Sequence, residues 1–313
     1  MRPLIDLHPR FASRLRPLLQ LPTPVHRLRS IDAWIKRDDI MGAPIGGSKA
    51  RTLEFCLDRF TDGRTVLAFG PFGSNWLANL AWAGRTFGFP VEIWTFPQVL
   101  NDHAARNRLA IRGVSRHSAG YAEFAAAALV RAGRVFSART RVAPIAGTEP
   151  STVLAHVNAA LELGRQIDAG ELPAPRRIVV ALGSGGTAAG LLAGTQLLGL
   201  STEIVAVRIT SLLMANRPRV LSLARRTLAM LAPDAALESG RLRLVHDYCG
   251  TYGEPIPAGR AARARFRSEE GIDLDDSYTA KAAAALLALP KAEGPVLFWN
   301  TFAKRELETV PLS

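Results

Sequence analysis

The chain has 313 residues, of which 48% are hydrophobic and 21% are charged, and its formal net charge is +12. This composition excludes a wholly disordered protein, because enough apolar surface is present to offset the entropy lost on folding. Two cysteines, Cys56 and Cys249, exclude a disulfide framework and a four-thiolate metal site. The opening Met1–Asp6 contains no apolar signal segment, so we expect a cytoplasmic protein.

The positive charge comes from 34 arginines and five lysines spread along the whole chain. Nucleic-acid binding needs a basic patch or stripe, so we expect no nucleic-acid partner. One segment, Ile178–Thr202, is uncharged over 25 residues and exceeds the ~20 residues of a membrane helix. A polar glycine turn interrupts this segment, so we expect a buried strand, turn and helix there and no membrane span. The six histidines show no zinc-site spacing, and we expect no metal.

The hydrophobic pattern alternates between strands and helices along the chain. In chain order, the predicted elements are a helix opening at Arg51–Glu54, a strand at Thr65–Phe69, a helix at Trp76–Phe87, a strand at Val91–Phe96, helices at Tyr121–Ala132 and Thr152–Ile167, a strand at Ile178–Leu182, a helix at Ala188–Leu198, and strands at Glu203–Ile209 and Pro295–Trp299. This alternation predicts an α/β fold of two domains, each with a mainly parallel sheet flanked by helices. We expect residues 46–150 to form a small domain, inserted between residues 1–45 and 151–313 of a large domain.

Two turns that follow predicted strands are suited to anions. In Gly183-Ser184-Gly185-Gly186-Thr187, successive N–H groups and the start of the next helix predict a phosphate cradle. The turn has neither the lysine of a Walker loop nor the spacing of a dinucleotide fingerprint, and it could instead serve only close packing. In Gly73-Ser74-Asn75, the N–H groups suit a carboxylate and the Asn75 amide suits a phenolate oxygen, although Ser and Asn are also ordinary helix caps.

Lys49 follows Gly46-Gly47-Ser48 and lies at the start of a predicted helix. The ammonium form of a lysine is disfavoured at such a place, as a Schiff-base lysine requires, although most lysines are simply solvated. A phosphate cradle, a lysine and a carboxylate cradle together predict a pyridoxal 5'-phosphate site for a small amino-acid substrate.

These segments resemble the fold type II pyridoxal-phosphate enzymes, in particular the D-cysteine desulfhydrase and 1-aminocyclopropane-1-carboxylate deaminase family. Gly46–Arg51 is similar to the family's Gly-Gly-Asn-Lys-x-Arg, and Tyr252–Pro255 and Asp276–Thr279 are similar to its two active-site tyrosine segments. The resemblance covers most of the chain and implies a homodimer. It implies catalytic roles for Lys49, Ser74, Tyr252 and Tyr278, cofactor contacts from Lys49, Asn75, Gly183, Ser184, Gly185, Gly186, Thr187 and Thr279, and substrate contacts from Ser74, Asn75, Trp76 and Thr301.

The chain departs from the family pattern mainly where a substrate would lie. Thr52 replaces a lysine near the phosphate, Gly73 replaces a glutamine, Trp76 replaces a histidine, and Phe302 replaces a glycine. The resemblance places Thr279 against the pyridine nitrogen, where a neutral hydroxyl favours β-elimination. We therefore expect a lyase or deaminase that releases ammonia and a 2-oxo acid, as a D-cysteine desulfhydrase does. Ring opening of the cyclopropane substrate, β-replacement in specialised metabolism and a non-catalytic binding protein on the same fold remain alternatives.

Overall fold

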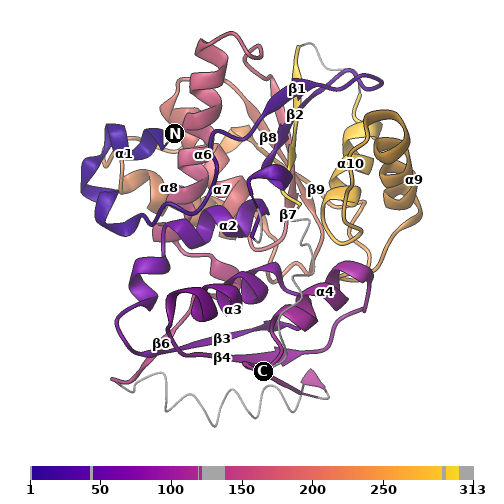
Figure 1. Cartoon of the computed structure of the whole chain (residues 1–313). Coiled ribbons are helices and arrows are strands. Elements are labelled where there is room, and N and C mark those ends of the chain that lie inside the picture. Colours follow the sequence, from indigo (N-terminus) through magenta and orange to yellow (C-terminus); the bar gives the residue numbers. More distant parts are fainter. Residues whose placement is uncertain (1, 43–44, 119, 122–137, 291–293, 303–313) are drawn as a thin grey trace.

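The computed structural model describes residues 2–42, 45–118, 120–121, 138–290 and 294–302, and its elements form two sheets with helices packed on them (Figure 1). Of the predicted helix Tyr121–Ala132, only Tyr121 lies within the described residues. The fold is the predicted α/β arrangement with parallel sheets flanked by helices.

The larger sheet has six strands in the order β1-β2-β10-β7-β8-β9. Its strands are β1 (Val25–Arg27), β2 (Trp34–Arg37), β7 (Arg177–Leu182), β8 (Glu203–Arg208), β9 (Leu242–Val245) and β10 (Val296–Asn300). Only β1 runs antiparallel to its neighbour. The near-continuous apolar runs of β7 and β8 follow from this position, because a parallel sheet is covered on both faces.

Alternate residues of β7 and β8 point to two separate cores. Ile178 and Val180 pack with α6 (Pro150–Asp168), α7 (Gly186–Leu197) and α8 (Arg217–Ala229) on one face. Val179 and Val205 pack with α9 (Pro257–Arg265) and α10 (Thr279–Ala288) on the other face. This period of two is that of a strand buried on both sides.

The smaller sheet has four parallel strands in the order β5-β4-β3-β6. Its strands are β3 (Thr65–Pro71), β4 (Val91–Phe96), β5 (Ser115–His117) and β6 (Thr140–Val142), and the helices beside it are α2 (Gly47–Glu54), α3 (Asn75–Phe87) and α4 (Asp102–Ala110). Ser74 caps α3 by accepting a hydrogen bond from the Leu77 N–H, and Gly88 ends it with a φ of 71°.

Short elements complete the described chain. They are α1 (Pro3–Leu7), the 3₁₀ helices η1 (Pro9–Arg14), η2 (Asp38–Ile40), η3 (Leu57–Phe60), η4 (Ile145–Gly147) and η5 (Ser239–Arg241), and the π-turn η6 (Phe266–Glu270). The hydrophobic pattern did not predict β5, β6 and β9, because a strand of three or four residues is too short to show a period of two.

The two sheets are separate, with β3 in one and β7 in the other, as the two-domain prediction requires. Leu19, Met41 and Ile45, which precede the predicted boundary, pack into the core of the smaller sheet. The exact bounds at residues 46 and 150 therefore stay a prediction.

Candidate active site

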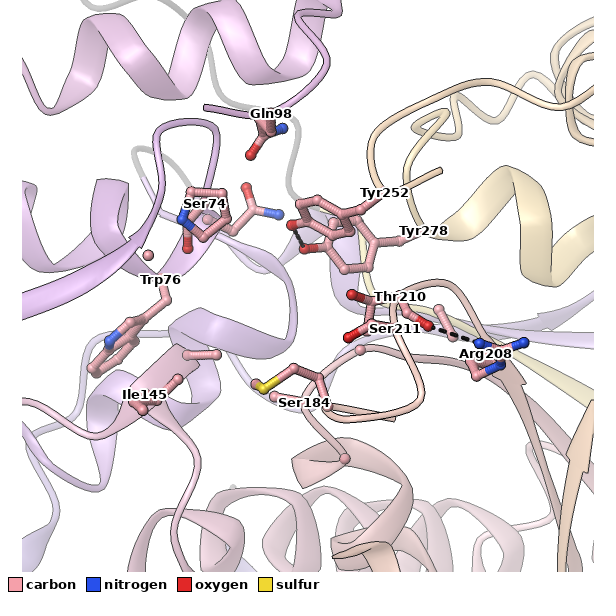
Figure 2. Close-up of a pocket in the computed structure, with 18 of the residues that line it drawn as sticks. Ser74, Trp76, Gln98, Ile145, Ser184, Arg208, Thr210, Ser211, Tyr252 and Tyr278 are labelled. Carbon is pink, nitrogen blue, oxygen red and sulfur yellow. Dashed lines mark hydrogen bonds between the residues drawn. The ribbon is translucent and has the colours of Figure 1, made fainter. Parts of the chain in front are cut away.

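A cavity of about 1210 Å³ lies between the two sheets. The segments that follow β3, β4, β7, β8 and β10 line it, together with the start of α2 and the turns around residues 146 and 250. In open α/β sheets the carboxyl ends of the strands are where ligands bind, because the loops and helix N-termini there face outward. Figure 2 shows side chains from both halves of the molecule pointing into this space.

Lys49 lies in this cavity, in the first turn of α2. Its Nζ donates to the Ala146 carbonyl oxygen at 2.8 Å and to Ser184 Oγ at 3.2 Å. Burial and, to a smaller extent, the charge of Arg219 lower the pKa of Lys49 to about 8. The amine is therefore closer to its nucleophilic neutral form at pH 7 than an ordinary lysine.

Close backbone approach explains the glycine that precedes this lysine. Gly47 has a φ of +70°, and a Cβ there would lie 2.5 Å from the Thr301 carbonyl oxygen. The start of α2 can therefore meet the segment after β10 only with glycine at this position. Ala146, which accepts the bond from Lys49, has a positive φ of 51°, a strained conformation of the kind that gathers at functional sites.

The glycine turn after β7 forms the wall of the cavity beside Lys49. Within the described residues, the N–H groups of Ser184, Gly185, Gly186 and Thr187 donate to no backbone carbonyl. Gly185 has a φ of +93°, and α7 begins at Gly186. Unpaired N–H groups at a helix start fit a phosphate, as the sequence predicted.

A positively charged side chain, that of Arg219, lies beside this turn, and the sequence analysis did not predict it. Arg219, in the first turn of α8, donates from Nε to the Ser184 carbonyl oxygen at 3.1 Å. The Thr52 hydroxyl donates to the Ser48 carbonyl oxygen, and its Oγ1 lies 3.3 Å from His156 Nε2. The family pattern has a lysine near the phosphate at the position of Thr52. In this chain Arg219 supplies a positive charge beside the phosphate turn instead.

The predicted carboxylate turn lies across the cavity, after β3. Asn75 Oδ1 accepts from Asn107 Nδ2 at 2.8 Å, which turns the amide so that its NH₂ end faces away from Asn107. Gly73 is required by packing, because a Cβ there would lie 2.5 Å from Ala104 Cβ. Gln98 Oε1 accepts from the Gly73 N–H at 3.1 Å, so an amide side chain reaches this turn from the end of β4 (Figure 2). Sequence inspection missed Gln98, since it lies 25 residues from the turn it contacts.

Two tyrosines face one another on the large-domain side of the cavity. The Tyr252 and Tyr278 hydroxyls form a hydrogen bond, and the rings meet edge to face with centroids 5.9 Å apart (Figure 2). Burial raises the pKa of Tyr252 to about 12 and, with the Tyr252 charge, raises that of Tyr278 further above its ordinary value. Both hydroxyls therefore keep their protons at neutral pH and can donate them.

Thr279 lies behind this wall and does not line the cavity. It is fully buried, and its hydroxyl donates to Asp275 Oδ2 at 2.8 Å and accepts from the Asp275 N–H. The hydroxyl is therefore held by the turn before α10, and this geometry gives no support to a contact with the pyridine nitrogen. Thr301, at the end of β10, does line the cavity.

Trp76 lines the cavity but is mainly a core residue. The side chain is 1% exposed, its ring lies 6.5 Å from that of Phe60, and a Cβ on Gly147 would lie 2.7 Å from it. Phe302 stacks against His103 at 5.6 Å and does not line the cavity. Of these two departures from the family pattern, only Trp76 lines the cavity, and a substrate contact from Trp76 stays a prediction.

A buried ionic network fixes the helix that carries Lys49. Arg51 donates to both carboxylate oxygens of Asp38, at 2.9 and 2.7 Å, and to both of Glu162, at 3.0 Å each. Lys36 Nζ lies 2.6 Å from Glu162 Oε1, and Trp299 Nε1 donates to Asp38. The network joins β2, η2, α2, α6 and β10, so it orients the first turn of α2 against the large sheet.

Comparison with known proteins identifies the family. Residues 17–300 match the family of pyridoxal-phosphate-dependent enzymes. The chain belongs to this family. It is 36% identical to nocardicin C-9' epimerase of Nocardia uniformis subsp. tsuyamanensis, over 93% of each chain, and 29% identical to D-cysteine desulfhydrase of Salmonella choleraesuis, over 91% and 92%. A crystal structure of an ACC deaminase homologue matches with a TM-score of 0.82 and 26% identity over 97% and 96% of the two chains.

The predicted fold type II architecture, the dependence on pyridoxal phosphate and the similarity to D-cysteine desulfhydrase are thereby confirmed. More distant structures such as maize serine racemase, at 18% identity and a TM-score of 0.63, share the fold. No helix among the described residues is both long and apolar enough to span a membrane. Within the same residues, no three His, Cys, Asp or Glu side chains gather as a metal site would require.

The residues present fit the cofactor. The unpaired N–H groups of the glycine turn suit the phosphate, Lys49 suits the carbonyl carbon and the Asn75 amide suits the phenolate oxygen. When bound, pyridoxal phosphate withdraws electrons from the substrate's α-carbon.

Proposed function

We propose that this enzyme is a lyase that removes the α-proton and a β-substituent from an amino acid. Hydrolysis of the released enamine then gives ammonia and a 2-oxo acid. The observation that carries the proposal is the position of Lys49, whose pKa is lowered to about 8 and whose Nζ lies 3.2 Å from the phosphate turn. The similarity to D-cysteine desulfhydrase over 91% of the chain supports this reaction.

Each side chain has a task in this proposal. The Lys49 amine takes the proton from the α-carbon. The Ser74 hydroxyl and the Asn75 N–H hold the substrate carboxylate, because the N–H groups of Gly73 and Ser74 already donate to Gln98 Oε1 and to the Pro71 carbonyl oxygen. The hydroxyls of Tyr252 and Tyr278, which stay protonated at neutral pH, donate a proton to the departing β-substituent. Ring opening of 1-aminocyclopropane-1-carboxylate and β-replacement would use the same groups and are alternative outcomes.

A second candidate function is inversion of configuration at the α-carbon. The 36% identity to nocardicin C-9' epimerase favours it. Lys49 and Ser74, which both line the cavity, are the two groups that would exchange protons in this reaction. In an epimerase the proton removed by one group is replaced from the other face, and no ammonia is released.

One experiment separates these reactions. The holoenzyme is incubated with D- and L-cysteine, D- and L-serine, β-chloroalanine and 1-aminocyclopropane-1-carboxylate. Ammonia, 2-oxo acid and the enantiomeric ratio are then measured. Ammonia with 2-oxo acid supports the lyase, and a changed enantiomeric ratio without ammonia supports the epimerase. If the cofactor is bound but neither occurs with these small amino acids or with D- or L-phenylalanine, the non-catalytic alternative is favoured.

Lys49→Ala and Lys49→Arg test the role of Lys49, because neither side chain can hold the cofactor covalently, and we expect both variants to fold. We expect both variants to lose the visible absorbance of the lysine-bound cofactor and all turnover. Trapping of the cofactor by borohydride on Lys36 or Lys281 would contradict the assignment. We further propose a homodimer, on the basis of the family resemblance, and analytical ultracentrifugation tests it. The cytoplasmic location stays a prediction from the opening residues.

A further inference from the structure

The mouth of the cavity carries exposed apolar side chains. Val99, Tyr121, Ile145 and Leu213 line the cavity, yet 37%, 66%, 61% and 84% of their surfaces are exposed. Large exposed apolar side chains gathered at one place mark a binding surface, whereas single ones do not. Three of the four belong to segments beside the smaller sheet, and Leu213 belongs to the loop between β8 and α8. The two sides of the mouth therefore present apolar surface to the same opening.

The inner part of the cavity has a different character. Lys49, the glycine turn, the turn of Ser74 and the two tyrosine hydroxyls lie there. In the proposed function these groups contact the cofactor, the substituents of the α-carbon and the β-position of a substrate. The whole cavity has a volume of about 1210 Å³, which the cofactor and the substrate share. A substrate as small as cysteine would leave the apolar mouth in water.

The charged residues of the wall are already engaged. Arg208 donates from Nε to His246 Nδ1 at 2.9 Å and from Nη1 to the Thr210 carbonyl oxygen. The Asp275 carboxylate accepts from Thr279 and from the Tyr278 N–H. The four exposed side chains of the mouth carry no charge themselves, so the mouth suits an uncharged group.

An aromatic pair is held at the mouth. The Tyr121 ring lies 5.2 Å from the ring of Phe96, which also lines the cavity, and the Tyr121 hydroxyl donates to the Pro97 carbonyl oxygen. That bond fixes the ring against the end of β4. Fixed ring faces and edges favour a further aromatic ring over an aliphatic chain of the same area.

We infer that the substrate is an amino acid with a bulky, uncharged, aromatic side chain that extends from the α-carbon to this mouth. The inference rests on the proposed removal of the α-proton, and it replaces the small substrate with a large one. Tyr121, Ile145 and Leu213 are then residues that determine specificity.

Exchange of the α-proton tests the inference, because this step precedes both elimination and epimerisation. The holoenzyme is placed in D₂O with D- or L-alanine, or with D- or L-phenylalanine, and deuterium at the α-carbon is followed by NMR. We expect kcat/KM for exchange to be about tenfold or more higher for one phenylalanine enantiomer than for either alanine, which corresponds to burying one ring.

Leu213→Ser and Tyr121→Ser test whether the mouth causes the preference for phenylalanine over alanine. Each side chain is mostly exposed, so each variant is expected to fold. We expect each to lower kcat/KM for phenylalanine severalfold while leaving alanine unchanged. Leu7→Ser is the matched control, since Leu7 is 62% exposed on α1 and does not line the cavity.

The possible failures are distinct. If alanine exchanges as well as phenylalanine, or if Leu213→Ser affects both equally, the inference is wrong and the proposed function stands. If Leu213→Ser changes the sedimentation coefficient and leaves exchange intact, the mouth is a contact between subunits and the inference is again wrong. If no amino acid exchanges its α-proton, the proposed function fails and the inference fails with it.

Discussion

Replacement of Glu162 by glutamine tests whether the buried ionic network holds the helix that carries Lys49. Glu162 is fully buried, and its Oε1 accepts from Lys36 Nζ at 2.6 Å, from the Thr23 N–H at 2.9 Å and from Arg51 Nη2 at 3.0 Å. Glutamine has nearly the same shape. It removes the negative charge, however, and leaves two buried cations that share the charge of Asp38 alone.

The magnitude follows from the pKa of the carboxyl group. Burial alone would raise it, but Arg51 and Lys36 lower the pKa of Glu162 from 4.5 to about 2. At about 1.36 kcal/mol per pKa unit, this difference makes the ionised form about 3 kcal/mol more favourable in the folded protein than in the unfolded chain. Breaking a buried ion pair from one side costs about 3–5 kcal/mol, so the two arguments agree. The loss is a large fraction of a typical stability of 5–15 kcal/mol.

The pKa shift of Glu162 also predicts how this stabilisation changes with pH. Because the folded pKa is below the unfolded one, the stabilisation is complete above pH 4.5 and is lost as the pH falls toward 2. We therefore expect Glu162→Gln to lower the free energy of unfolding by about 3–5 kcal/mol at pH 7. The gap to the wild type should narrow to roughly half by pH 3.

Urea unfolding at several pH values, followed by tryptophan fluorescence, measures this gap. Glu269→Gln is the matched control, because Glu269 forms a solvent-exposed pair with Arg265, and such pairs contribute little to stability. A loss below about 1 kcal/mol at pH 7, or a gap that is the same at pH 3 and pH 7, would refute the reasoning.

Two further predictions concern the phosphate turn. Gly185→Val should abolish cofactor binding, because the φ of +93° at Gly185 disfavours a side chain and a Cβ would lie 3.3 Å from Val220 Cγ2. Gly199→Val is the control and should retain cofactor binding, because Gly199 has a similar φ of +67° but open space around a Cβ. Fluorescence titration with pyridoxal phosphate measures both, and wild-type affinity in Gly185→Val would count against the turn. Arg219→Gln should raise the pKa of Lys49 above about 8 and weaken cofactor binding severalfold, because a neighbouring positive charge is lost. The pH dependence of Lys49 acylation in the apoenzyme tests this, with exposed Arg225→Gln as control; unchanged values would remove Arg219 from the site.

The sequence by itself determined the features that depend on neighbouring residues. Strands such as β7 appear in it because a buried parallel strand needs a continuous apolar run. The turn from Gly183 to Thr187 and the glycines before Lys49 also appear, because close approach of the backbone requires glycine locally. These local signals place the lysine and the phosphate turn at strand and helix ends, and the family follows from their combination.

Only the tertiary structure decided which distant side chains meet at those turns. Gln98 reaches Gly73 from the next strand, and Arg219 reaches Ser184 from a helix 35 residues further along the chain. Thr279, adjacent to a tyrosine of the cavity, faces Asp275 instead, because successive residues at the start of α10 point in different directions. Such contacts depend on how helices cross and how loops end. The period of the sequence sets which face of an element is apolar, whereas packing between elements sets what that face touches.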